Sequence, residues 1–155
     1  NVAQLLTFSQ DLSPRELAIL AAQDAGGISS VASLSGVGDL IQQDGRPEWR
    51  WSASATWRKG PLGAGWYTSF VDDVYDTSAT NDTTGEFWSV DSALTHNAYL
   101  QYTLFDATDG PLELRLGARN LFDEEPPLAD EDFGYMGSLH SANGRQVYVQ
   151  AKKTF

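Results

Sequence analysis

Carboxylates are the side chains of this chain with the clearest capacity for chemistry, and they gather in two segments. Of the 21 Asp and Glu residues in the 155-residue chain, six lie in residues 72–91 and six in residues 121–144, and neither segment contains Lys or Arg. Carboxylate oxygens are ligands for Ca²⁺, but the cluster Asp123–Asp132 lacks the spacing of an EF-hand loop, and a Pro-Pro pair interrupts it. An acidic surface of this kind can also favour cationic or metal-bearing ligands through its potential. For the cluster Asp123–Asp132 we predict a solvated loop and no metal site.

Other kinds of chemistry find little support in the sequence. His96 and His140 lie far apart and have no third partner at ligand spacing, so neither predicts a metal centre. No G-x-S-x-G nucleophile motif is present, and Gly60, Gly63 and Gly65 lack the Lys-Ser/Thr of a phosphate-binding loop. These glycines instead indicate close backbone approach or strand curvature. We therefore expect a protein that is not an enzyme and needs no cofactor.

The two acidic segments also carry aromatic side chains, which makes them the best candidates for contact with a ligand. The candidate ligand-facing residues are Trp88, Asp130, Glu131, Phe133 and Tyr135. Packing within the loops is the alternative role for the aromatic members of this set.

The acidic segments connect strands, because hydrophobicity alternates with a period of two from Pro47 onward. From Trp49 to Arg58, Trp and Ala alternate without interruption with Arg, Ser and Thr. Five strands of about ten residues are predicted, over residues 49–58, 62–71, 94–105, 112–120 and 146–155. Short links follow the first and third strands, and the long acidic segments follow the second and fourth. An antiparallel up-and-down meander of about five to six long strands then places the short turns at one rim and the long connections at the other.

Residues 1–46 depart from this pattern and predict a loop region with one short helix. Ser13, Pro14 and Glu16 provide a capping box and a first turn for a helix over about residues 14–23. A weak strand is expected near residues 28–34, in a stretch rich in Gly and Ser. The chain therefore divides into residues 1–46 and 47–155.

The strand length favours a membrane protein. A tilted strand crosses the hydrocarbon layer in about 9–11 residues, whereas strands of soluble proteins average about 5–6. Trp49 and Trp57 share one face and lie about 26 Å apart along the strand at 3.3 Å per residue, which suits the aromatic girdles of a membrane barrel. We predict an all-β fold that forms the wall of a transmembrane β-barrel. The alternative is a soluble β-sandwich with one solvated face, used as a carbohydrate-binding module with aromatic platforms.

Composition argues against several other classes. A formal net charge of −11 disfavours a nucleic-acid partner, because nucleic acids bind to basic protein surfaces. The absence of Cys excludes a disulfide framework and thiolate metal clusters within the chain. No apolar run reaches the roughly 20 residues of a membrane-spanning helix.

Two motifs resemble one family. Residues 120–127, Asn-Leu-Phe-Asp-Glu-Glu-Pro-Pro, resemble the motif that precedes the last strand of TonB-dependent outer-membrane receptors, and residues 144–155 resemble the C-terminal strand of that family. The resemblance spans about residues 47–155 and implies the C-terminal wall of a barrel in the bacterial outer membrane, in contact with membrane lipid. It also implies energy-coupled uptake of a large, scarce nutrient of the siderophore, cobalamin, haem or glycan class, that is, a small-molecule or metal-chelate ligand.

The chain departs from the family in extent. It contains five clear strands where such transporters have about 22, and it contains no plug, through which an inner-membrane energy-coupling complex acts in the family. We therefore expect a receptor segment that is not transport-competent alone. The isolated segment would leave edges and an apolar face open, so we expect it to self-associate or to cover that face with the helix.

Overall fold

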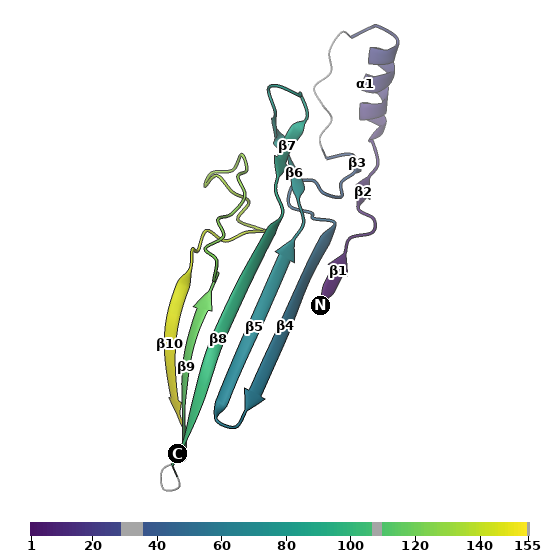
Figure 1. The fold of residues 1–155 in the computed structure, drawn as a ribbon. Helices are drawn as coiled ribbons and strands as arrows, with labels where there is room; N and C mark the ends of the chain where they lie inside the picture. The colour runs from purple at the N-terminus through teal and green to yellow at the C-terminus, as the bar shows by residue number, and fades with distance from the viewer. Residues whose placement is uncertain (29–35, 107–109, 155) are drawn as a thin grey trace.

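The computed structural model describes residues 1–28, 36–106 and 110–154, and its main feature is a six-stranded antiparallel sheet in the order β1-β4-β5-β8-β9-β10 (Figure 1). The strands are β1 Val2–Gln4, β4 Trp49–Lys59, β5 Leu62–Val71, β8 Ala93–Asp106, β9 Gly110–Arg119 and β10 Gln146–Lys153. The five strands expected from alternation are confirmed, in up-and-down order. The sheet is open, with β1 and β10 at its two edges. An all-β fold is therefore established, and a closed barrel is not.

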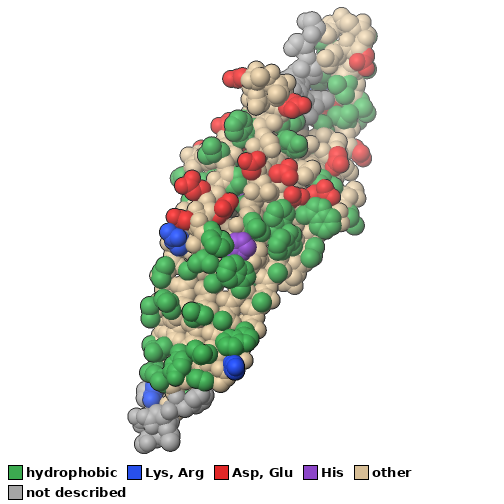
Figure 2. Space-filling view, viewed as in Figure 1, with side chains coloured by type: hydrophobic (Ala, Val, Ile, Leu, Met, Phe, Trp, Pro, Cys, Tyr) green, Lys and Arg blue, Asp and Glu red, His purple; other side chains and the backbone are tan. Residues whose placement is uncertain are grey.

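The register places the apolar face of every long strand on the same side of the sheet. One row across it consists of Ala55, Trp66, Ala98, Ala118 and Val147, and the next consists of Trp57, Ala64, Leu100, Leu116 and Val149. Because side chains alternate across a strand, the polar residues between these rows face the other side. Figure 2 shows the apolar face as a band of hydrophobic side chains, with acidic side chains above it and basic ones near its lower end.

The turn between β4 and β5 lies at the lower end of the sheet, where β8 ends and β9 begins (Figure 1). Lys59 pairs with Leu62 across the β4–β5 turn, where Gly60 has a φ of 59°, in the left-handed region that glycine adopts readily. Asp106 pairs with Gly110 where β8 meets β9. Both long connections leave from the opposite rim, as the alternation of link lengths predicts.

The first long connection is more ordered than the loop that the sequence predicts. It contains a hairpin of β6 (Val74–Thr80) and β7 (Phe87–Val90). Val74 pairs with Val90, and both side chains are fully buried. The hairpin is stabilised by this small local core rather than by a long periodic stretch, which is why alternation does not reveal it.

The buried apolar core lies at the upper rim and not beneath the sheet. Val74, Val90, Ala129 and Met136 form it, with Leu139 packed against them. These residues belong to the two long connections, which therefore pack against each other above the strands.

The apolar face of the sheet, in contrast, is open. Leu100 is 65% exposed, Leu116 is 53% exposed and Val149 is 76% exposed. Within the described ranges, no helix or second sheet packs over this face.

The N-terminal region contributes one edge strand and the expected helix. α1 (Pro14–Asp24) begins with the predicted capping box, in which Glu16 N donates to Ser13 Oγ at 3.3 Å and Ser13 N donates to the Glu16 carboxylate at 2.6 Å. The hydrogen bonds between Glu16 and Ser13 lower the pKa of the Glu16 carboxyl group. No described helix is long and apolar enough to cross a membrane.

The expectation that this helix covers the apolar face is wrong. No residue of α1 is buried, and α1 stands beyond the upper rim, away from the strands (Figure 1). The chain holds it there, because β2 (Ser9–Gln10) before it pairs with β3 (Gly38–Asp39) after it. Of the strand expected near 28–34, residue 28 is not in a strand and the other residues lie outside the described ones.

Candidate functional site

Three segments meet above the upper end of the sheet, and we call them together the rim cap: residues 40–46, 72–92 and 128–139. The first two are joined by backbone contacts, because Tyr75 N donates to Gln42 O at 2.6 Å and Asp44 N donates to Tyr75 O at 2.9 Å. The Asp44 carboxylate also accepts from Thr77 N at 3.0 Å and from Thr77 Oγ1 at 2.9 Å. The segment before β4, which belongs to the predicted loop region 1–46, is thus part of the cap.

Asp76 joins the second segment to the third. Its side chain is 3% exposed, and its Oδ1 accepts from the amide and the hydroxyl of Ser78, while Oδ2 accepts from Asp130 N at 2.8 Å. A buried carboxylate is costly unless such donors surround it. Asp76 is therefore a structural acceptor, unlike the exposed carboxylates of the cluster Asp123–Asp132.

The predicted ligand-facing residues all lie on the rim cap, but they differ in their surroundings. Trp88 is 38% exposed and its Nε1 donates to Leu128 O at 3.0 Å, so it ties the hairpin to the second connection. Asp130 and Glu131 are exposed, and Tyr135 is half-buried.

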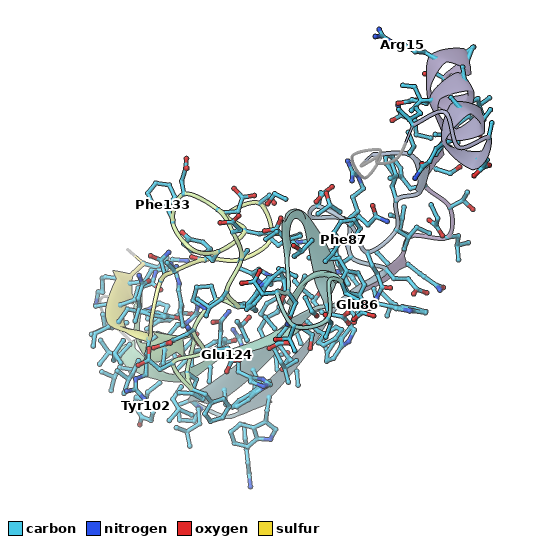
Figure 3. All side chains as sticks on the ribbon, turned by 90° about the horizontal axis from the view of Figure 1, so that it is seen from above. Arg15, Glu86, Phe87, Tyr102, Glu124 and Phe133 are labelled. Carbon is cyan, nitrogen blue, oxygen red and sulfur yellow. The ribbon has the colours of Figure 1, made fainter. Side chains whose placement is uncertain are left out.

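Phe133 is the most exposed of the aromatic candidates. It is 85% exposed and lies at the tip of the second connection, where its side chain projects away from the sheet (Figure 3). Ala129 N donates to Gly134 O at 3.0 Å and Gly134 N donates to Glu131 O at 2.7 Å, so a tight turn holds this tip. An exposed aromatic ring next to exposed carboxylates offers stacking and cation contacts to a ligand.

The motif at residues 120–127 lies at the start of the second long connection, which joins β9 to β10, and it forms hydrogen bonds to the end of that connection. The Asn120 side chain donates to Glu124 O at 2.8 Å and to Asn143 O at 3.2 Å, and it accepts from Glu124 N at 2.8 Å. The Asp123 carboxylate accepts from Arg145 N at 2.5 Å. Asn120 has a φ of 47°, a conformation that Asn tolerates better than most residues. The motif thus joins the start of the connection to its end.

A small polar cavity of about 280 Å³ lies between this connection and the polar face of β5, β8 and β9. His140 lines it, and its Nε2 is buried with no partner among the described residues. Burial, together with the charge of Arg50, lowers the pKa of His140 and so favours the neutral imidazole. The structure thus places His140 at the rim, where it is half-buried.

His96 lies on the other face, in an aromatic cluster at the upper end of the apolar band. Trp66 Nε1 donates to Thr68 Oγ1 at 2.8 Å, and Thr68 Oγ1 lies 2.8 Å from His96 Nδ1. The His96 ring is 5.3 Å from the Trp66 ring and 5.3 Å from the Phe122 ring. These contacts satisfy polar atoms within an apolar surface.

Within the part of the chain that the structure describes, no three His, Asp or Glu side chains are placed to hold a metal ion. The acidic segments are therefore better described as a surface of negative potential with one buried acceptor, Asp76. The chain matches no family model, no curated protein and no solved structure.

Proposed function

We propose that this chain forms the C-terminal part of the wall of a TonB-dependent receptor in the bacterial outer membrane, which takes up a large, scarce nutrient. The observation that carries the proposal is the exposed apolar face that all the long strands of the sheet share. The two sequence motifs add support, because the resemblance that they carry predicts the same wall.

The exposed apolar face argues for lipid on that side of the sheet. Contiguous apolar surface on a soluble monomer is usually limited, and larger patches mark sites of interaction with protein or membrane. A soluble β-sandwich needs a second sheet over such a face, with side chains of the two sheets interdigitated. The described residues provide no such sheet, and their buried core lies in the rim cap instead.

The dimensions of the apolar face agree with those of a membrane barrel. Trp51 stacks on Phe70 at a centroid distance of 5.5 Å at its upper end, and Tyr102 pairs with Leu62 at its lower end. These two rows are eight residues apart, about 26 Å along the strand at 3.3 Å per residue. A strand tilt of about 40° reduces this to about 20 Å along the membrane normal, close to the apolar band of about 25 Å between the aromatic girdles of such barrels.

The opposite face has the character of a wet or plug-filled lumen. Arg115 donates to Gln101 Oε1 at 2.7 Å and lies over the Tyr99 ring, with its Cζ 4.3 Å from the centroid. Arg119 lies over the Tyr148 ring at 5.7 Å. Cations on this face thus have polar and aromatic partners within the sheet.

We place the rim cap on the extracellular side of the membrane and the short turns on the periplasmic side, which is the orientation that the resemblance to the receptor family implies. The cap then presents Phe133 and the exposed carboxylates to the incoming small-molecule or metal-chelate ligand. Transport requires the rest of the barrel and a plug that couples it to the inner-membrane energy-coupling complex, neither of which this chain contains.

Single cysteines at neighbouring positions test the proposal, since the chain has no Cys of its own. Ala55, Thr56, Val149 and Gln150 are all exposed, so differences among them report the environment and not burial. A nitroxide label on the full-length protein in outer-membrane vesicles should contact oxygen dissolved in lipid from positions 55 and 149. Labels at the matched control positions 56 and 150 should not.

Equal oxygen access at all four positions would refute the lipid-facing assignment. Recovery of the full-length protein in the aqueous fraction of broken cells, without detergent, would refute the membrane location.

A further inference from the structure

The apolar face is not uniform, because it contains a furrow. The furrow has a volume of about 530 Å³, within the range of about 300–1,000 Å³ of ligand pockets. Its floor is formed by small side chains, and its walls by larger ones. The apolar side chains that line it include Ala64, Ala98 and Ala118 on the floor and Trp57, Trp66 and Leu100 around them.

The register shows where the furrow opens. In the row below its centre, Ala64 lies between Trp57 and Leu100, which leaves a gap between two large side chains. In the next row down, Leu62 lies between Lys59 and Tyr102. An acyl chain that enters along β5 from the lower rim would pass over Leu62 and Ala64 before it reaches the furrow, and we call this course the path.

The lower end of this path carries positive charge on the apolar face. Lys59 is exposed, and it falls on the same face as Trp57 because the two are two residues apart on β4. Tyr102 is 44% exposed and places a hydroxyl-bearing ring in the same row. An ammonium group and a phenol at the edge of an apolar band suit a lipid phosphate, since such residues anchor at the level of the headgroups.

The length of the path fits one leaflet. From the Lys59 row to the row of Trp66 and Ala98 is four residues, about 13 Å along the strand at 3.3 Å per residue. At a strand tilt of about 40° this is about 10 Å along the membrane normal, close to half of an apolar band about 25 Å tall. A chain whose headgroup lies at the lower rim would therefore lie along the wall to about the middle of the membrane.

We infer that the furrow holds one acyl chain of an inner-leaflet phospholipid, with its phosphate between Lys59 and Tyr102. This site rests on the proposed function and deepens it, because it assigns a bound lipid to one place on the membrane-facing wall. The occupant is a phospholipid, since the proposed function places lipid against this face and a phosphate at the level of the headgroups supplies an anionic partner for Lys59.

The experiment uses the full-length protein, extracted from outer membranes in a mild detergent and exchanged into micelles that contain a defined amount of phosphatidylglycerol. Native mass spectrometry measures the lipid retained by each protein. Wild type should retain one phosphatidylglycerol. Lys59→Gln removes the charge and should lower lipid retention by about fivefold, the factor that corresponds to the contribution of one lysine near an anionic surface. Ala98→Leu fills the furrow and should lower lipid retention by about fivefold or more.

Two variants serve as matched controls. Ala53→Leu adds the same side chain to the same face of β4 outside the furrow, and Lys152→Gln removes a lysine at the same rim on the other face. Both should retain lipid as wild type does. Lys59 is exposed, so Lys59→Gln keeps the test decisive even where Ala98→Leu impairs folding.

Equal retention in all variants would overturn the site, as would a wild-type membrane protein that retains no phospholipid or pairs through this face with a second copy. Those outcomes leave the barrel wall standing. A wild-type protein that is not in the membrane at all refutes the proposed function itself.

Discussion

Tyr99 and Gly65 offer a sharp test of how the polar face of the sheet is packed. They are cross-strand partners, and a Cβ added at Gly65 would lie 2.1 Å from Tyr99 Cε1 and 2.5 Å from Cζ. No real Cβ contact is that short, so Gly65→Ala must displace the ring. The ring is not free to lift, because Arg115 covers it at 4.3 Å and is itself bonded to the buried Gln101.

We expect Gly65→Ala to destabilise the protein by about 1–3 kcal/mol, the usual cost of overpacking. In a Tyr99→Ala background the obstacle is gone, and the same substitution should stabilise by about 0.5–1 kcal/mol, because glycine in a strand interior is unfavourable relative to alanine. The double-mutant cycle should therefore give a coupling energy of about 1.5–4 kcal/mol, with a change of sign between the two backgrounds.

Equilibrium urea unfolding of the full-length protein in lipid vesicles, followed by Trp fluorescence, measures these differences. Gly63→Ala is the matched control on the same strand and face, because its added Cβ would meet Gln101 Cβ at an ordinary 3.6 Å. It should stabilise by about 0.5–1 kcal/mol, as Gly65→Ala does once the Tyr99 ring is removed. The reasoning fails if Gly63→Ala and Gly65→Ala have equal effects, or if removing the Tyr99 ring leaves the cost of Gly65→Ala unchanged.

Three further outcomes are expected. Asp76→Asn places an amide group among hydrogen-bond donors and should lower the free energy of opening of the rim cap by about 1–3 kcal/mol. The amides of residues 128–136 should then exchange hydrogen faster, whereas Asp132→Asn, at an exposed position, should leave their exchange unchanged. Equal exchange in the two variants would contradict the role of Asp76. Because burial and Arg50 lower the pKa of His140 in the folded chain, the unfolded chain binds more protons as the pH falls below about 6.5. Stability should be full above that pH and decline below it, and His140→Gln should flatten this slope in urea midpoints measured from pH 8 to pH 5. Ser13→Ala removes the N-cap of α1, which has no buried residues, and should lower the stability of that helix by about 1 kcal/mol. The helical circular dichroism signal should decrease, and the urea midpoint for unfolding of the sheet should not change.

The glycines of β5 illustrate what sequence reasoning can and cannot resolve. The spacing of Gly63 and Gly65 indicated close approach in general, and this is confirmed at Gly65, where the Tyr99 ring covers the backbone. Their spacing alone does not separate the two positions, because the difference depends on which β8 side chain lies opposite each glycine. Gly117 repeats the arrangement under Tyr148.

The locally regular elements can be predicted from the residues alone. A period of two assigns each residue of the long strands to a face without knowledge of the neighbouring strands, and short turns then bring those faces to the same side. The capping box of α1 is equally local, since its two hydrogen bonds join residues three apart. For these reasons the five long strands, their order and the helix follow from the residues alone.

The rim cap was decided only by the tertiary structure. Asp76 has the same local surroundings as the solvated carboxylates near it, and it is buried because Asp130, 54 residues away, donates to it. Asn120 and Asp123 close a connection whose far end, at Asn143 and Arg145, is remote in sequence. Such contacts form between irregular segments that have no period to read, so their partners become known only when the strands below them have set the distance between the connections.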